Sequence, residues 1–158
     1  MSLLDRIPAD DHDARFMRAA LDEARAAAER GEVPVGAVVV INNEMVARAG
    51  NRTIADCDPI AHAEVIALRE ASKRIGNYRL AGAALYVTIE PCAMCAGAMI
   101  QARIARLIYG APDAKGGAVH SCFEVLDHPQ LNHRVEVAAG VLADEAAAVL
   151  KDFFAARR

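Results

Sequence analysis

The order of hydrophobic patterns along this 158-residue chain predicts an α/β protein, a three-layer α-β-α sandwich around a mixed five-stranded sheet. Short β-branched runs alternate with longer amphipathic segments, which is the pattern of strands connected by helices. The first two strands are separated only by Asn42-Asn43, a turn signal, so they should pair as an antiparallel hairpin. The later strands are separated by helices and should run parallel. The length suits one domain spanning residues 1–158.

The first half of the chain supplies a helix, a hairpin and a second helix. An Ala-, Arg- and Glu-rich amphipathic helix covers residues 12–30, and Gly31 ends it. A continuous β-branched run over residues 35–41 is typical of a buried strand, and residues 44–49 return as its partner. Asp58-Pro59 predicts the next helix start, because Asp can cap and Pro suits the first helical position. Apolar residues at helical spacing continue this helix to Gly76.

The second half alternates strands and helices until the final helix. Residues 84–89 alternate as a strand, Pro91 opens a helix to about Gln101, and residues 103–109 form a strand that Gly110 ends. Residues 111–132 carry Gly, Pro, Asp and His and predict a functional loop with some helical turn. Residues 133–137 are expected to be the last strand and residues 141–157 the last helix.

Composition excludes some classes of protein. No apolar run reaches the roughly 18 residues that a membrane-spanning helix needs. The N-terminus lacks a basic region followed by an apolar stretch, so we expect no secretory signal and a cytoplasmic location. The net charge of −3 does not by itself indicate nucleic-acid binding, although a local basic track would suffice for it.

Two short motifs together predict a metal centre. His62-Ala63-Glu64 stands in mid-chain, and Pro91-Cys92-Ala93-Met94-Cys95 follows at the start of a predicted helix. Cys92 and Cys95 are three residues apart, which places both thiols on one face of a helix, and the helix N-terminus favours thiolates. His62, one turn into its helix, would be the third ligand. Because no fourth ligand stands at a suitable spacing, the pattern indicates an open coordination position and therefore a catalytic zinc site.

Glu64 is predicted to act beside the metal and not on it. Its offset of two residues from His62 corresponds to roughly 200° on a helix, which is poor geometry for two ligands of one ion. A carboxylate in this place could take a proton from water that the metal activates, and return it to a leaving group.

Other interpretations of the cysteines remain. A lone C-x-x-C pair can be a redox motif, although such a motif normally lacks a distant H-x-E partner. Cys57 and Cys122 are expected to be small buried hydrophobic residues and not ligands.

The H-x-E and P-C-x-x-C motifs together resemble the signature of the zinc-dependent nucleobase deaminases. Further segments resemble the bacterial tRNA-specific adenosine deaminase branch of that family. These are residues 32–38, 51–52, 61–64, 77–80, 85–88, 90–100, 110–117, 132–136 and 152–154. The resemblance covers nearly everything after about residue 14 and implies a cytidine deaminase-like fold.

The resemblance implies hydrolytic deamination of the wobble adenosine of a tRNA anticodon loop to inosine, by zinc-activated hydroxide with a Glu proton shuttle. It assigns one Zn²⁺ per subunit to His62, Cys92 and Cys95, and the proton shuttle to Glu64. It places Asn51 and Asp113 at the flipped nucleotide and Lys115 near the RNA backbone, although turn chemistry explains such loop residues equally well. It also implies a homodimer whose partner subunit helps to form the RNA site.

Two alternatives remain, and the second belongs to a different class of protein. A deaminase of a free base or nucleoside, such as guanine or cytosine, would share both motifs. A non-catalytic, zinc-stabilised RNA-binding subunit would share the ligands, but it would have no use for Glu64 beside an open coordination position.

Overall fold

The computed structural model describes residues 11–158, and the helices and strands follow the predicted order. The expectation of no secretory signal concerns the N-terminal segment, which lies outside the described residues. The elements are α1 (Asp11–Glu29), β1 (Gly36–Ile41), β2 (Glu44–Gly50), α2 (Ala63–Ile75), β3 (Ala84–Ile89), α3 (Ala93–Ala102), β4 (Arg106–Ala111), the 3-10 turn η2 (Val125–Asp127), β5 (Glu136–Ala139) and α4 (Ala143–Ala155). Between residues 11 and 158, no helix is both long and apolar enough to cross a lipid bilayer.

The sheet is mixed, as the sequence predicts. Its five strands lie in the order β2-β1-β3-β4-β5. β1 runs antiparallel to both β2 and β3, whereas β3, β4 and β5 are parallel. The β1–β2 turn is tight because Asn42 and Asn43 both adopt left-handed φ angles, of 51° and 63°, which asparagine tolerates better than most residues.

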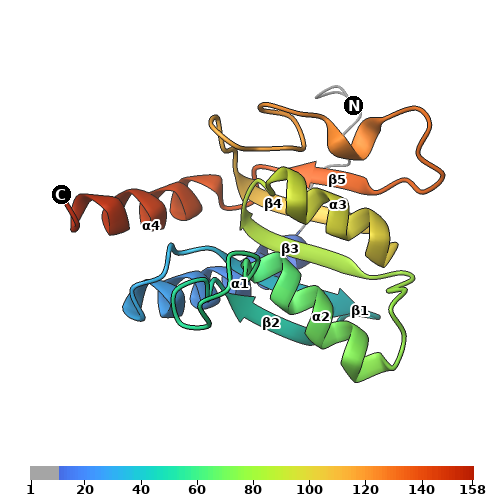
Figure 1. Ribbon diagram of the computed structural model, residues 1–158, viewed down its shortest axis with the longest axis horizontal. Helices are drawn as coiled ribbons and strands as arrows, with labels where there is room; N and C mark the ends of the chain where they lie inside the picture. Colours follow the sequence, from blue (N-terminus) through green and yellow to red (C-terminus); the bar gives the residue numbers. More distant parts are fainter. Residues whose placement is uncertain (1–10) are drawn as a thin grey trace.

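α2 and α3 cover one face of the sheet, and α1 covers the other together with the start of α4, which then projects beyond the sheet (Figure 1). This arrangement confirms the three-layer sandwich. Successive residues of a strand point to opposite faces. Val38, Tyr86 and Ile108 therefore pack with α1, whereas Val39 and Leu85 join the larger cluster under α2 and α3. Burial on both faces explains why the strand sequences are continuous apolar runs.

The prediction that α2 starts at Asp58-Pro59 is wrong. Asp58 instead closes a local turn, its Oδ1 accepting from the N–H of Ile60 at 2.9 Å. The helix begins at Ala63, and His62 is its N-cap residue in an extended conformation. The cap comes from a distant residue, because Asn51 Oδ1 accepts the N–H of Ala63 at 2.8 Å. Asp58 is therefore not needed at the helix start.

Strand boundaries after residue 100 differ from the prediction. Arg103 takes a left-handed conformation (φ 59°) that ends α3, so β4 begins only at Arg106. Gly110 does not end β4 but lies within it. A Cβ at Gly110 would lie 2.5 Å from the carbonyl oxygen of Thr88, so this glycine permits close approach of the β3 backbone. β5 spans Glu136–Ala139, later than predicted.

Candidate metal centre and substrate cavity

His62, Cys92 and Cys95 come together where the N-termini of α2 and α3 meet. His62 and Cys92 are the extended N-cap residues of their helices, and Cys95 lies in the first turn of α3. The position of His62 corrects the prediction that it lies one turn into a helix. His62 Nδ1 lies 3.6 Å from Cys92 Sγ and 3.5 Å from Cys95 Sγ. The spacing of the motifs thus places one imidazole and two thiols around one point.

The donor set fits a tetrahedral zinc ion. Zn–S bonds of about 2.3 Å and Zn–N bonds of about 2.05 Å at the tetrahedral angle put nitrogen and sulfur roughly 3.6 Å apart. The observed separations of 3.6 and 3.5 Å agree with this value. Among residues 11–158, His62, Cys92 and Cys95 form the group of potential ligands whose atoms lie within 4.8 Å of one another, and Glu64 is not a member.

The three side chains also shift one another's pKa values. A hydrogen bond from Cys95, followed by one from His62, lowers the pKa of Cys92 to about 4. The bond to Cys92 and burial together raise the pKa of the Cys95 thiol. Hydrogen bonding to Cys92 also raises the pKa of His62. The protein alone therefore stabilises one thiolate here, and a second thiolate at Cys95 needs a nearby positive ion.

Glu64 is the second residue of α2 and is 4% exposed. Its burial raises the pKa of the carboxyl group, so the group can bind and release a proton nearer neutral pH. The helical-offset argument against Glu64 as a ligand does not apply, because His62 precedes the helix. The catalytic assignment of Glu64 remains a prediction.

A cavity of about 260 Å³ opens beside the metal ligands. Asn51, which is 8% exposed, is one of its lining residues. Because Asn51 Oδ1 accepts the N–H of Ala63, the amide orientation is fixed and the Nδ2 group remains a donor for a ligand. The complete lining consists of Val33, Val35, Asn51, Thr53, His62, Glu64, Ile89, Glu90, Cys92 and Asp113.

Asp113 lines the cavity and also organises a turn. Its Oδ1 accepts the N–H groups of Lys115 at 3.0 Å and Gly116 at 3.2 Å. The turn chemistry left open by the sequence is therefore present, beside a position suited to substrate. Lys115 is exposed on this turn and does not line the cavity, which leaves its side chain accessible to a larger ligand.

Glu90 follows β3 and is 3% exposed. Its carboxylate accepts the N–H groups of Asp113, Val119, His120 and Ser121 and the Ser121 hydroxyl, at 2.5 to 3.1 Å. Burial alone would raise the pKa of Glu90, but these donors, led by the Ser121 hydroxyl, lower it to about 2. Glu90 therefore holds the loop that forms one wall of the cavity.

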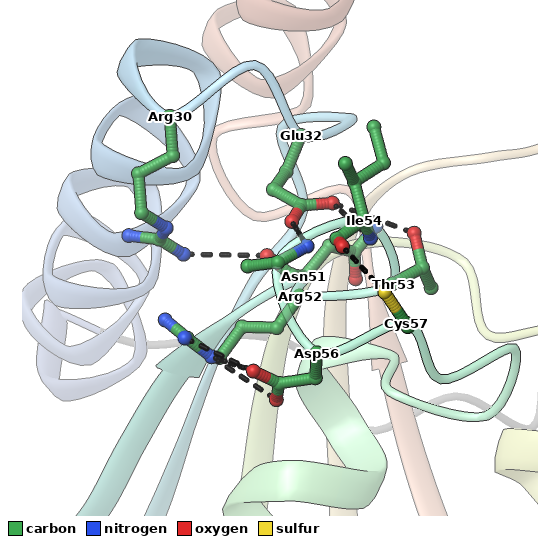
Figure 2. Close-up of polar contacts among 9 residues, drawn as sticks. Arg30, Glu32, Asn51, Arg52, Thr53, Ile54, Asp56 and Cys57 are labelled. Carbon is green, nitrogen blue, oxygen red and sulfur yellow. Dashed lines mark hydrogen bonds and ion pairs between the residues drawn. The ribbon is translucent and has the colours of Figure 1, made fainter.

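Glu32 holds another part of the cavity lining, at Thr53, in a similar way. It is 1% exposed, and its carboxylate accepts the N–H groups of Ile54 at 3.1 Å and Ala55 at 2.8 Å, with Thr53 Oγ1 at 3.4 Å (Figure 2). Sequence reasoning assigned no role to Glu32 or Glu90. The available signal was a carboxylate just before or just after a buried strand, a position where charge is rarely left without partners.

Two further sequence expectations need correction. Cys57 and Cys122 are exposed and not buried. Neither belongs to the group of potential metal ligands formed by the described residues, as expected.

Comparison with known proteins gives consistent results. A MafB19-like deaminase family model matches residues 10–158. The chain is 46% identical to a tRNA-specific adenosine deaminase of Bacillus subtilis over 90% of this chain and 88% of that protein. It is 50% identical to one of Agrobacterium fabrum over 90% of this chain and 94% of that protein.

Two solved structures show the same fold at different distances. A structure from a study of A-to-I editing by tRNA:A34 deaminases at the wobble position matches with a TM-score of 0.84 and 50% identity, over 86% of this chain and 99% of that one. A guanine deaminase from Nitrosomonas europaea matches with a TM-score of 0.75 and 25% identity, over 95% of this chain and 87% of that one.

Proposed function

Because this chain belongs to the MafB19-like deaminases and to the tRNA-specific adenosine deaminases among them, we infer that it converts the wobble adenosine of a tRNA anticodon loop to inosine. The reaction adds water at C6 of the adenine and releases ammonia. The observation that carries this inference is the 50% identity, over nearly the whole chain, to a tRNA-specific adenosine deaminase. The guanine deaminase resemblance is weaker, at 25% identity, and does not favour a free-base substrate.

The geometry supports the metal and catalytic assignments. His62, Cys92 and Cys95 would hold one zinc ion per subunit, since their donor atoms have tetrahedral zinc spacing. When bound, zinc supplies Lewis-acid activation of a water molecule. Glu64, buried beside these ligands, would relay both protons of the attacking water, the first to N1 of the adenine and the second to the amine that departs as ammonia.

The cavity walls support the substrate assignments. The free Nδ2 donor of Asn51 suits an acceptor atom on the base or ribose, and Asp113 is a second polar residue of the same lining. A cavity of about 260 Å³ accommodates a single nucleotide and not a base within a stack, so the adenosine must be extruded. An anticodon loop supplies an unpaired nucleotide at low cost. Lys115, which is exposed on the turn that Asp113 organises, would contact the RNA backbone.

A homodimer is also part of the proposal. An apolar groove of about 640 Å³ runs between α2 and α3. It includes three exposed hydrophobic residues, namely Ile60 (44%), Tyr78 (69%) and Met94 (37%). A second copy would cover this groove. Sedimentation velocity at micromolar concentration should give a dimer, and Met94→Glu should weaken it; a monomeric wild type would contradict this part of the proposal.

The remaining parts follow from the substrate. The chain acts on tRNA, so we place it in the cytoplasm, and residues 1–158 serve as one deaminase domain. Of the basic residues available for RNA, Arg106 is committed elsewhere, since it forms an ion pair with buried Asp13 at 2.7 Å. Lys151, Arg157 and Arg158 on or after α4 are exposed and remain candidates.

The decisive experiment compares four substrates. An anticodon stem-loop RNA with a wobble adenosine is incubated with the zinc-loaded protein in parallel with free adenosine, guanine and cytosine. We expect inosine at the wobble position and no ammonia from the free compounds. Ammonia from guanine or cytosine, with the stem-loop unchanged, would overturn the tRNA assignment while retaining a deaminase.

A further inference from the structure

Glu32 is a buried carboxylate that lies behind the cavity and not in it. It sits between α1 and β1, and the next residue, Val33, lines the cavity. Its carboxylate meets the start of the loop formed by residues 52–58, where it receives two backbone N–H groups and one hydroxyl (Figure 2). A charged acceptor with several short donors makes stronger hydrogen bonds than a neutral pair.

The loop also has backbone hydrogen bonds of its own, from the N–H groups of Asp56, Cys57 and Asp58 to oxygens within residues 52–54, and one from Arg52 to Ala61. Other supporting contacts are few. Ile54, Ala55, Asp56 and Cys57 are exposed, so the loop gains little from apolar burial. Cys57 adopts a left-handed φ of 48°, which a non-glycine residue rarely takes without support. The Arg52–Asp56 ion pair is exposed on both sides and contributes little. The bonds to Glu32 are therefore the contacts that tie residues 53–55 to the segment between α1 and β1.

The loop in turn shapes the substrate site. Thr53 donates its hydroxyl to Glu32 and lines the cavity, two residues after Asn51. The same segment has a second contact, because Arg30, just after α1, donates to the backbone oxygen of Asn51 at 3.2 Å. A shift of the loop would move Thr53 and disturb Asn51, while Cys92 and Cys95, at the start of α3, belong to a different segment.

We propose that Glu32 is a positioning residue for substrate binding: it fixes the 52–58 loop as one wall of the nucleotide cavity. This inference rests on the proposed function, because it concerns the same cavity. If the loop adopts the correct position for only a fraction of the time, the apparent dissociation constant of the substrate rises by the inverse of that fraction. Chemistry at the bound base would be affected much less.

The test uses Glu32→Gln and Glu32→Ala in the full-length, zinc-loaded protein. Gln retains the shape but replaces one acceptor with an N–H donor facing backbone N–H groups, and Ala removes the contact entirely. KM for the anticodon stem-loop should rise about tenfold in the Ala variant, with Gln intermediate and kcat within about twofold of wild type. Hydrogen exchange at the amides of Ile54 and Ala55 should accelerate in the same order.

Asp13→Asn is the matched control. Asp13 is also 1% exposed and bonded to Tyr86 and Arg106, but it does not line the substrate cavity. This variant should lower the melting temperature while leaving KM and the exchange of Ile54 and Ala55 unchanged. Asp56→Asn changes an exposed residue of the same loop and should leave both KM and the hydrogen exchange of Ile54 and Ala55 unchanged.

The outcomes separate the two proposals. An unchanged KM in Glu32→Ala, or unchanged exchange at Ile54 and Ala55, would overturn the positioning role. If the wild-type protein deaminates a free base but not the stem-loop RNA, only the proposed function is overturned. The exchange comparison, and the KM for that base, would then still test Glu32.

Discussion

The carboxyl group of Glu90 lies against the backbone of Gly117, in the space that any side chain at position 117 would occupy. The loop that carries Gly117 folds around this carboxylate and delivers to it the N–H groups of Val119, His120 and Ser121. A glycine is therefore needed at position 117 for close approach and not for a left-handed φ angle. The contact explains how one wall of the cavity is built around a buried charge.

Gly117→Ala should displace Glu90 from its donors. We expect destabilisation by about 1–3 kcal/mol, since overpacking and the loss of charge-assisted hydrogen bonds act together. Activity on the stem-loop should fall as well. Gly116→Ala is the matched control, because its Cβ would meet only Asp113 Oδ2 at an ordinary 3.5 Å. Thermal unfolding of the two variants measures the difference, and equal melting temperatures would contradict the account.

Two substitutions at Asn51 should separate its two contacts. Asn51→Asp retains an acceptor for the N–H of Ala63, so the helix cap survives, but it removes the Nδ2 donor. Asn51→Ala removes both and should cost about 1 kcal/mol of stability through the lost cap. KM should rise about tenfold or more in both variants, because a substrate acceptor loses its partner. A wild-type KM in Asn51→Asp would show that the amide does not touch substrate.

Glu64→Gln should abolish turnover and leave the metal bound. The amide cannot shuttle a proton, and general acid–base catalysis contributes about 10²–10⁴-fold to such rates. The measurements are single-turnover deamination and zinc content by atomic absorption. Loss of zinc in this variant would indicate that Glu64 is a metal ligand and would contradict its assignment as the proton shuttle.

The thiols should divide into two pairs. Cys92→Ser and Cys95→Ser should lose zinc and activity, since each sulfur lies at the distance from His62 Nδ1 that is expected between two ligands of one zinc ion. Cys57→Ser and Cys122→Ser should retain both, because these residues are exposed and lie outside the ligand group. A chelator should inactivate wild type, and added Zn²⁺ should restore it. Full activity after complete metal removal would refute a catalytic zinc.

The stabilising effect of Glu32 should depend on pH. Burial alone would raise its pKa, but the N–H groups of Ala55 and Ile54 and the positive charge of Arg30 outweigh burial and lower the pKa below 4.5. Arg52 is the other cation that interacts with this carboxylate. A lowered folded pKa gives stability that is complete above the ordinary value of 4.5 and is lost as pH falls below it.

The comparison of wild type with Glu32→Gln measures this dependence. The difference in free energy of unfolding should be constant above about pH 5 and should narrow as the solution is acidified. Urea titrations between pH 7 and pH 3 give both values at each pH. A difference that stays constant across this range would mean that Glu32 carries no stabilising charge.

The sequence alone determined the layered sheet and the group of potential metal ligands. Strand periods and the Asn42-Asn43 turn are local properties, so they identified the strands before any contact was known. The motif spacing selected His62, Cys92 and Cys95, because ligand chemistry depends on residue type and on two adjacent helix starts. The resemblance then supplied the substrate, which no local pattern contains.

Tertiary structure decided the helix start at Ala63, the strand boundaries near Gly110 and the roles of Glu32 and Glu90. Asn51 caps α2 from outside the helix, and Gly110 serves close approach to Thr88; neither partner is near in sequence. The two carboxylates acquire their functions only when distant loops fold over them. Hydrogen bonds of this kind depend on which backbone N–H groups the fold buries together, and a linear pattern of residue types does not record that.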